Sequence, residues 1–404
     1  MSNATPAANL PLEPETTLPV PRGPVRSFTR HVLTQAWARQ GARLGLAWII
    51  VLVFCAVFAP FLANSHPILM KQSGVISSPL LRHLTPTDVW LLVAAFTSVL
   101  LLLPRFTLAK RAMFWAAIVL VAAPLCFQFV RPPKTVVFER YREATKAGLV
   151  EWAVHTPIAF SPTDRLRDQP ELRLTAPSLA HPMGTDIDGS DVASRMIYAC
   201  RIALSIGFIS TGIATIIGII VGGILGYFAG WVDMIGLRIV EVFSAIPTLF
   251  LLLAFVAFFG RNLYLMMVII GLTGWVGTAI FVRAEFLRLR QQDFVQAAKA
   301  CGLPLWSILF RHMLPNGITP VLVNVSFGVA GGILSESTLS FLGLGLVDEP
   351  SWGALLNQAL GAGGSFYWWI AYFPGKAIFL TVLAYNLIGE ALRDAIDPRA
   401  MERA

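Results

Sequence analysis

The sequence predicts an all-α protein that crosses a membrane several times. Of its 404 residues, 56% are hydrophobic and 13% are charged, whereas about a quarter of the residues in an average soluble domain are charged. The mean hydropathy is +0.67. A bilayer core about 30 Å thick needs roughly 20 mostly apolar helical residues. Eight segments meet or approach that length: Leu44–Ala63, Val89–Leu103, Ala112–Val130, Ala203–Phe228, Val242–Phe259, Leu263–Val282, Ile318–Ser335 and Lys376–Leu392.

Basic residues indicate which ends of these segments face the cytoplasm, because cytoplasmic loops carry an excess of Lys and Arg. The tail before Leu44, the short turn 104–111 and the loop 283–316 are all rich in basic residues. The segment 336–375 has neither Lys nor Arg in its sequence and is expected outside. Eight spans with both termini in the cytoplasm satisfy this pattern. Val89–Leu103 and Ala112–Val130 therefore cross as a pair or not at all.

The same pattern divides the chain into five parts. A cytoplasmic tail (1–43) precedes N-terminal transmembrane helices (44–130), an extracytoplasmic loop (131–201), a transmembrane core (202–392) with a cytoplasmic loop at 284–316, and a second tail (393–404). We interpret Leu44–Ala63 as a retained signal anchor, because its apolar run is longer than that of a cleaved signal. Four scattered cysteines indicate no disulfide framework.

The extracytoplasmic loop contains an acidic cluster that can be compared with a calcium loop. Asp186 and Asp188 have the spacing of the first two ligands, but Asp191 stands where that motif requires glycine. The cluster is more typical of a turn that starts a helix, with Asp188 or Ser190 as the N-cap of Val192–Ala203. We expect that helix to lie on the outer surface, and we expect no metal site.

Glycines recur every four residues in the fourth predicted span, at Gly218, Gly222 and Gly226. Such a stripe lets the backbone of another helix approach closely. The approaching helix belongs either to the same bundle, which we favour, or to a dimer partner.

Several classes of activity lack the residues that they need. Between Ala203 and Gly332 no ionisable residue falls at mid-membrane depth, where an ion-coupled transporter usually needs an acid or a histidine. The sequence has no phosphate-binding loop and no HExxH motif, and its six histidines are dispersed. We therefore expect neither a catalytic residue nor a bound cofactor. Glu336, at the outer mouth of the seventh span, is interpreted as an exposed helix-end carboxylate, with a contact to a peptide amine as the alternative.

The loop between the sixth and seventh spans is predicted to hold two short helices, Gln291–Cys301 and Leu305–Met313, which meet at Gly302. Glycine ends the first helix, and Pro304 suits the first turn of the second. The loop is too apolar for a solvated surface, so we expect it to dock against a partner protein. Its candidate contacts are small residues for close approach, apolar anchors and charges: Ala297, Ala298, Phe294, Leu303, Lys299 and Arg311.

This loop resembles the EAA loop of ABC-type importer permeases in the spacing of Gln296-Ala297-Ala298, Gly302 and Leu314-Pro315, although Gln296 stands where that pattern often has Glu. Other segments resemble the C-type permeases of dipeptide and oligopeptide importers: His181–Asp186 (including Gly184 and Thr185) with Gly189–Asp191, Gly230–Asp233, Ile246-Pro247, Phe341–Gly345 with Trp352-Gly353, and Gly389–Pro398. Ala63–Leu69 and Ser78–Leu81 are similar to the branch that takes up longer peptides and microcin C.

The resemblance implies a type I ABC importer permease bundle in the inner (plasma) membrane, in contact with lipid, with one extra N-terminal helix pair. It implies a heterodimer with a second permease, two ATP-binding subunits that hold ATP and Mg, and an extracytoplasmic peptide-binding protein. No nucleic-acid partner is expected, and residues that line the substrate path are not assigned. A membrane sensor or anchor and an ion-coupled secondary transporter stay as alternatives.

Overall fold

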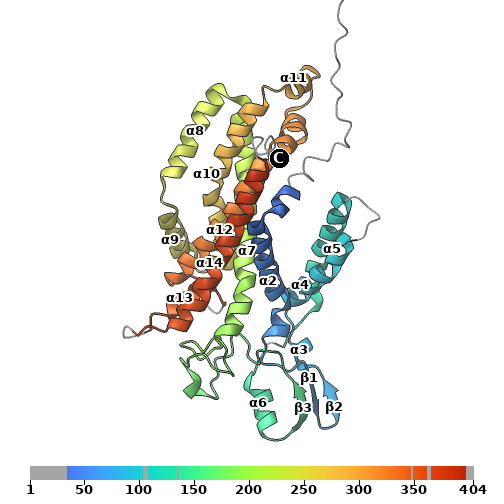
Figure 1. Ribbon diagram of the computed structural model, residues 1–404, viewed down its shortest axis with the longest axis vertical. Helices are drawn as coiled ribbons and strands as arrows, with labels where there is room; N and C mark the ends of the chain where they lie inside the picture. Colours follow the sequence, from blue (N-terminus) through green and yellow to red (C-terminus); the bar gives the residue numbers. More distant parts are fainter. Residues whose placement is uncertain (1–33, 103–107, 134–135, 347–348, 362–364, 397–404) are drawn as a thin grey trace, which may run out of the picture.

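The computed structural model describes residues 34–102, 108–133, 136–346, 349–361 and 365–396. Long helices lie side by side in an elongated bundle, with a small cap at one end and a short helix, α11 (Asp293–Ala300), at the other (Figure 1). Within the described residues, six helices are long and apolar enough to cross a membrane. Most of both predicted tails, Leu103 at the end of the second predicted span, and Pro398 lie outside the described residues.

Five long helices form the core of the bundle: α2 (Gln40–Leu62), α7 (Val192–Phe228), α10 (Leu263–Leu289), α12 (Leu314–Phe341) and α14 (Trp368–Ile396). The central element is α7, because α2, α10 and α12 all pack against it. The helices α12 and α14 begin before the spans predicted for them, because their first turns are polar or aromatic and escape a hydropathy criterion.

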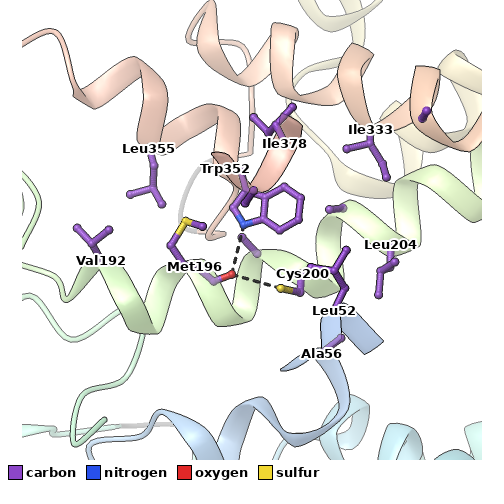
Figure 2. Close-up of a cluster of buried hydrophobic side chains, with 14 of the residues drawn as sticks. Leu52, Ala56, Val192, Met196, Cys200, Leu204, Ile333, Trp352, Leu355 and Ile378 are labelled. Atoms are coloured by element: carbon purple, nitrogen blue, oxygen red, sulfur yellow. Dashed lines mark hydrogen bonds between the residues drawn. The ribbon is translucent and has the colours of Figure 1, made fainter. Parts of the chain in front are cut away.

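Buried apolar side chains of α2, α7, α12, α13 (Trp352–Gln358) and α14 meet near the cap end of the bundle (Figure 2). The Trp352 side chain is 2% exposed, and its indole N–H donates to the carbonyl of Met196 on α7 at 3.3 Å. Leu355, one turn further along α13, is fully buried. The short helix between α12 and α14 is therefore part of the core.

The glycine stripe of α7 faces α10. A Cβ atom at Gly222 would lie 2.3 Å from the carbonyl oxygen of Ala279, and one at Gly226 would lie 2.6 Å from that of Arg283. Gly218 faces Thr278 in the same way, with 2.5 Å between the built Cβ and the threonine Cβ. The stripe is used for packing inside this chain, and a side chain at these positions would force the two helices apart.

The predicted span Val242–Phe259 is not one straight helix. The segment forms two helices, α8 (Gly230–Ala245) and α9 (Thr248–Phe259), whose axes differ by 73°. The break falls at Ile246-Pro247, where Ile246 has an extended ψ of 120°. Proline disfavours helical backbone at the residue before it and has no N–H to continue the helix.

A separate surface helix at Val192–Ala203 is wrong. Residues 192–228 form a single helix, because no proline and no glycine interrupts residues 192–206. Its N-cap is Asp191, whose carboxylate accepts the N–H of Ser194 at 2.8 Å, and neither Asp188 nor Ser190 takes that role.

The inserted helix pair consists of α4 (Pro86–Thr97), extended by a 3₁₀ segment, and α5 (Leu108–Phe129). Only α5 is long enough to span by itself, because the apolar helix of α4 ends at Leu101. Each helix receives an indole N–H from the other: Trp90 donates to Val119 at 2.9 Å, and Trp115 donates to Ala94 at 3.1 Å. Counting the bent α8–α9 pair as one span, seven spans are found among the described residues in place of the eight predicted.

An ion pair attaches this helix pair to the core. The carboxylate of Asp88, at the start of α4, lies 2.6 Å from the guanidinium of Arg201 on α7. Asp88 also closes a capping box with Thr85, and Arg201 donates to the carbonyl of Ala56 on α2 at 2.5 Å. Three elements therefore meet at one buried charge pair.

The cap contains a three-stranded antiparallel sheet with strand order β2-β1-β3, which the all-α prediction did not include. β1 (Leu69–Gln72) pairs with β2 (Val75–Ser77) in a hairpin and with β3 (Val150–Val154) from beyond the inserted pair. These strands are only three to five residues long, so their alternation is too brief for a sequence pattern to reveal. The pairing of β1 with β3 closes the cap around α6 (Glu139–Lys146).

Candidate functional site

The first candidate site is α11 and the segment that follows it, at the end of the bundle opposite the cap. Val295 is fully buried and Ala298 is 6% exposed, whereas Phe294, Gln296 and Ala297 are exposed. The two buried residues pack in one cluster with side chains of α10, of α12 and of η3, a π-helical segment at Ser307–Met313. One face of α11 thus holds it to the bundle, and the opposite face is free.

The turn after α11 depends on Gly302, which has a φ of +68°. The N–H of Gly302 donates to Lys299 at 2.9 Å, and the N–H of Leu303 donates to Ala298 at 3.2 Å. These two bonds make a Schellman motif, in which glycine takes the left-handed conformation at little cost. The predicted break at Gly302 therefore has a defined geometry, and it presents Leu303, 37% exposed, beside the free face of α11.

Polar contacts fix the segment to the ends of α7 and α10. The ammonium group of Lys299 lies 4.8 Å from the centre of the Tyr227 ring. Arg290 donates to the carbonyl of Tyr227 at 3.2 Å, and Gln296 donates to the carbonyl of Arg290 at 2.7 Å. Nearby, the guanidinium of Arg283 pairs with the carboxylate of Asp233 on α8. α11 is thereby connected to α7 and α10, and α10 is connected in turn to α8.

One predicted docking contact needs correction. Ala298 offers no surface to a partner, because it packs into this chain's own core. Lys299 is partly exposed over Tyr227, and its contact with a partner stays a prediction. The free face consists of Phe294, Ala297 and Leu303, whereas the side chain of the exposed Gln296 is held by its bond to Arg290. Periodicity placed both alanines in one helix, but it did not show which of them faces inward.

We call α11 and the residues that follow it, 293–313, the docking segment. Its end joins α12 without a break. The predicted second helix Leu305–Met313 is largely the π-helical η3, which runs directly into α12 at Leu314. Leu314 packs partly against the buried cluster, and Pro315 is exposed in the first turn of α12. Proline has no N–H to donate to the preceding turn, and it falls where the backbone changes from the π-helical to the α-helical pattern.

The second candidate site is a cavity of about 270 Å³ within the bundle. It lies between α7, α9, α10 and α12, and its walls consist mainly of glycine, serine, threonine and one asparagine. Asn324 of α12 donates to the hydroxyl of Thr278 on α10 at 2.9 Å. The lining residues are Ser210, Thr211, Ala214, Thr248, Ile270, Thr273, Gly274, Gly277, Thr278, Asn324, Gly328, Gly331, Gly332 and Ser335.

This lining has a definite chemistry. Hydroxyl and amide groups both donate and accept hydrogen bonds, and the glycines leave backbone within reach. No lining residue carries a charge. Such a wall can hydrogen-bond a peptide backbone without selecting its side chains. The sequence did not identify any of these residues as path-lining. The available signal was the recurrence of glycine in α10, at Gly274 and Gly277, and in α12, at Gly328 and Gly331.

The extracytoplasmic motif is an organising turn at the start of α7. One oxygen of Asp186 accepts the N–H groups of Asp188 at 3.0 Å and Ser190 at 2.8 Å, and the other oxygen pairs with Arg195. Asp191 also accepts from the ring of His181 at 2.8 Å. These carboxylates are thus committed to the turn.

The other two residues of this motif fix the turn to its surroundings. The carbonyl of Thr185 accepts the indole N–H of Trp369 on α14 at 3.1 Å. Gly184 has a φ of +76°, and a Cβ there would lie 2.6 Å from the carbonyl of Thr175. The motif therefore joins the cap to α7 and α14 of the core.

Both interpretations of Glu336, as an exposed helix-end carboxylate and as a contact to a peptide amine, are wrong. The side chain is neither exposed nor directed into the bundle cavity, since it is 2% exposed and accepts the hydroxyls of Ser340 at 2.6 Å and Ser337 at 3.3 Å. Gly353 of α13 packs directly on these serines, with a built Cβ 2.3 Å from the carbonyl of Ser337. α13 covers this end of α12, which the sequence did not show.

Comparison with known proteins agrees with this geometry. Residues 214–402 match the family of binding-protein-dependent transport system inner membrane components. The chain is 36% identical over 248 residues to the dipeptide transport system permease protein DppC of Alkalihalophilus pseudofirmus, which covers 61% of this chain and 81% of that protein. It is 41% identical to the oligopeptide transport system permease protein OppC of Haemophilus influenzae, over 54% and 70% of the two chains. It is 37% identical to the inner membrane ABC transporter permease protein YejE of Escherichia coli, over 61% and 72%.

Proposed function

The chain belongs to the family of binding-protein-dependent transport system inner membrane components, and we propose that it is one of two permease subunits of an ATP-driven peptide importer. The family resemblance and the polytopic α-helical class predicted from the sequence are confirmed. Two of the relatives are named for dipeptide transport and for oligopeptide transport, which supports a peptide as the substrate. The narrower branch for longer peptides and microcin C stays a prediction.

One observation carries this function: the docking segment connects two helices, α10 and α12, that both line the bundle cavity. The cavity is lined by Thr278 of α10 and Asn324 of α12, and α11 lies between these helices in the chain. Because α11 is also held by Tyr227 at the end of α7, a force on its free face reaches three walls at once. A bundle with two discrete packings would open and close the cavity in response.

Within this proposal, the partners follow from the surfaces that are free. Two ATP-binding subunits hold ATP and Mg, and one of them receives Phe294, Ala297 and Leu303. A second permease completes the path, and a peptide-binding protein delivers substrate at the cap. The α11 end is then cytoplasmic, in accord with the basic residues of 283–316. For both termini to be cytoplasmic as well, the shorter α4 must cross together with α5, because the seven spans counted by length are an odd number.

Co-purification of the full complex tests the docking role. The variant Ala297→Asp places a charge on the free face of α11, so we expect the second permease to be retained and the ATPase to be lost. Ala38→Asp is the matched control, because Ala38 is also an exposed alanine near the α11 end but lies outside the segment. Equal recovery of the ATPase with both variants would refute docking through α11. The variant Ala298→Asp is unsuitable, because it charges the chain's own core.

A further inference from the structure

An apolar cavity of about 390 Å³ lies behind the docking segment, between α7, α10 and η3. Ile220 and Ile224 of α7 form one wall, Phe286 of α10 forms the base, and Trp306 and Phe310 form the other wall. The rim is open, since Trp306 is 71% exposed, Ile220 45% and Ile224 39%. The cavity is separate from the polar cavity inside the bundle, and transport as proposed above makes no use of it.

The position of the cavity matches the hydrocarbon of one membrane leaflet. α7 ends at Phe228, and Ile224 and Ile220 lie four and eight residues before that end. With a rise of 1.5 Å per residue, the wall is about 6 to 12 Å from the helix end. Half of a bilayer core is about 15 Å deep. With the end of α7 at the edge of the hydrocarbon, the cavity opens at the depth of the acyl chains in the leaflet at the α11 end.

A positive charge lies beside the cavity. Trp306 and Phe310 stack with 3.9 Å between ring centroids, and the far side of this pair faces a hollow lined by Ser307, Arg311 and Pro315. Arg311 is exposed, and within the described part of the chain no carboxylate forms an ion pair with it. Basic pockets next to membrane helices bind anionic lipid head groups.

We propose that this cavity holds one acyl chain of an anionic phospholipid, whose phosphate pairs with Arg311. The exposed apolar rim suits the tail of such a lipid, and the exposed arginine beside it suits the head group. The lipid would pack against Phe286 and Leu309, which belong to the same cluster as Val295 and Ala298 of α11. Lipid occupancy would thereby stiffen the seat of the docking segment. The inference does not depend on the substrate or on the partners proposed above.

Native mass spectrometry of the full-length chain, released from nanodiscs of mixed phosphatidylglycerol and phosphatidylethanolamine, tests this site. We expect the wild type to retain phosphatidylglycerol. Ile220→Trp fills the cavity from its rim and should abolish the retained lipid. Ile216→Trp, one turn along the same exposed face of α7 and outside the cavity, is its matched control.

Arg311→Gln tests the charge without disturbing the packing, because the side chain is exposed. One arginine near an anionic surface contributes about 1 kcal/mol, so its loss should lower phosphatidylglycerol retention about fivefold and leave phosphatidylethanolamine unchanged. Arg238→Gln, at an exposed arginine of α8, controls for charge alone. Equal lipid retention in Ile220→Trp and Ile216→Trp, or in Arg311→Gln and Arg238→Gln, would overturn the proposal. So would a lipid-free dimer that Ile220→Trp dissociates, because the cavity would then be a protein interface.

Discussion

Replacing Gly222 with alanine should destabilise the bundle, because α7 and α10 touch at this point through their backbones. The new Cβ would lie 2.3 Å from the carbonyl oxygen of Ala279, and ordinary contacts begin at 3.4 Å. The helices must separate by about 1 Å or more, and the gap removes packing on both sides. Overpacking of this kind costs about 1–3 kcal/mol. Helix association in a membrane depends on close packing, so no burial of other apolar surface compensates.

The assay is reversible unfolding of the purified chain from mild detergent into dodecyl sulfate, followed by helical circular dichroism. Gly212→Ala is the matched control in the same helix, because no atom lies within 4 Å of a Cβ built there. Alanine favours a helix over glycine by about 1 kcal/mol, so the control should be as stable as the wild type or slightly more so. If Gly222→Ala is as stable as Gly212→Ala, the close approach of α7 and α10 is not what the stripe provides.

Three further variants probe other parts of the molecule. Asp88→Ala leaves the buried Arg201 without its ion-pair partner, which should lower the free energy of unfolding by about 3–5 kcal/mol. The variant should make α4 and α5 sensitive to protease, and unchanged resistance would contradict the ion-pair attachment. Burial, aided by the neighbouring His83, lowers the pKa of His66 from 6.5 to about 4. Between pH 4 and 6.5 the folded cap then binds fewer protons than the unfolded chain, so the stability of the cap should fall as the pH falls from 6.5 to 4. In a denaturant titration, His66→Gln should flatten this dependence on pH. Asn324→Leu removes one hydrogen-bonding group from the wall of the bundle cavity. A bond from this group to a peptide in transit would be worth about 1 kcal/mol, so peptide uptake by proteoliposomes should fall about fivefold with ATPase recovery unchanged; normal uptake would contradict a role in the path.

Hydropathy and local spacing revealed the class of the protein and the place of its docking segment. A long apolar run can satisfy its backbone in a membrane only as a helix or a closed barrel, so composition alone restricts the architecture. Gly302 and the glycines at four-residue intervals were informative for a similar reason. Their backbone requirements are local, and few residue types meet them.

Local patterns failed wherever one segment covers another. The alanines Ala297 and Ala298 are adjacent and alike in sequence, yet one is free and the other is buried under η3. Glu336 resembles an exposed helix end until α13 is placed over it.

By itself, the sequence determined that the protein is helical and spans the membrane several times, because hydropathy and backbone preference act over a few residues at a time. The permease family followed from the resemblance of its motifs, and docking through the loop stays a prediction. Only the tertiary structure decided which face of α11 is free, which small residues line the cavity, and how Asp88 holds the inserted helices to Arg201. The physical reason is that burial and pairing depend on residues far apart in the chain. Asp88 and Arg201 are 113 positions apart, and no local pattern connects them.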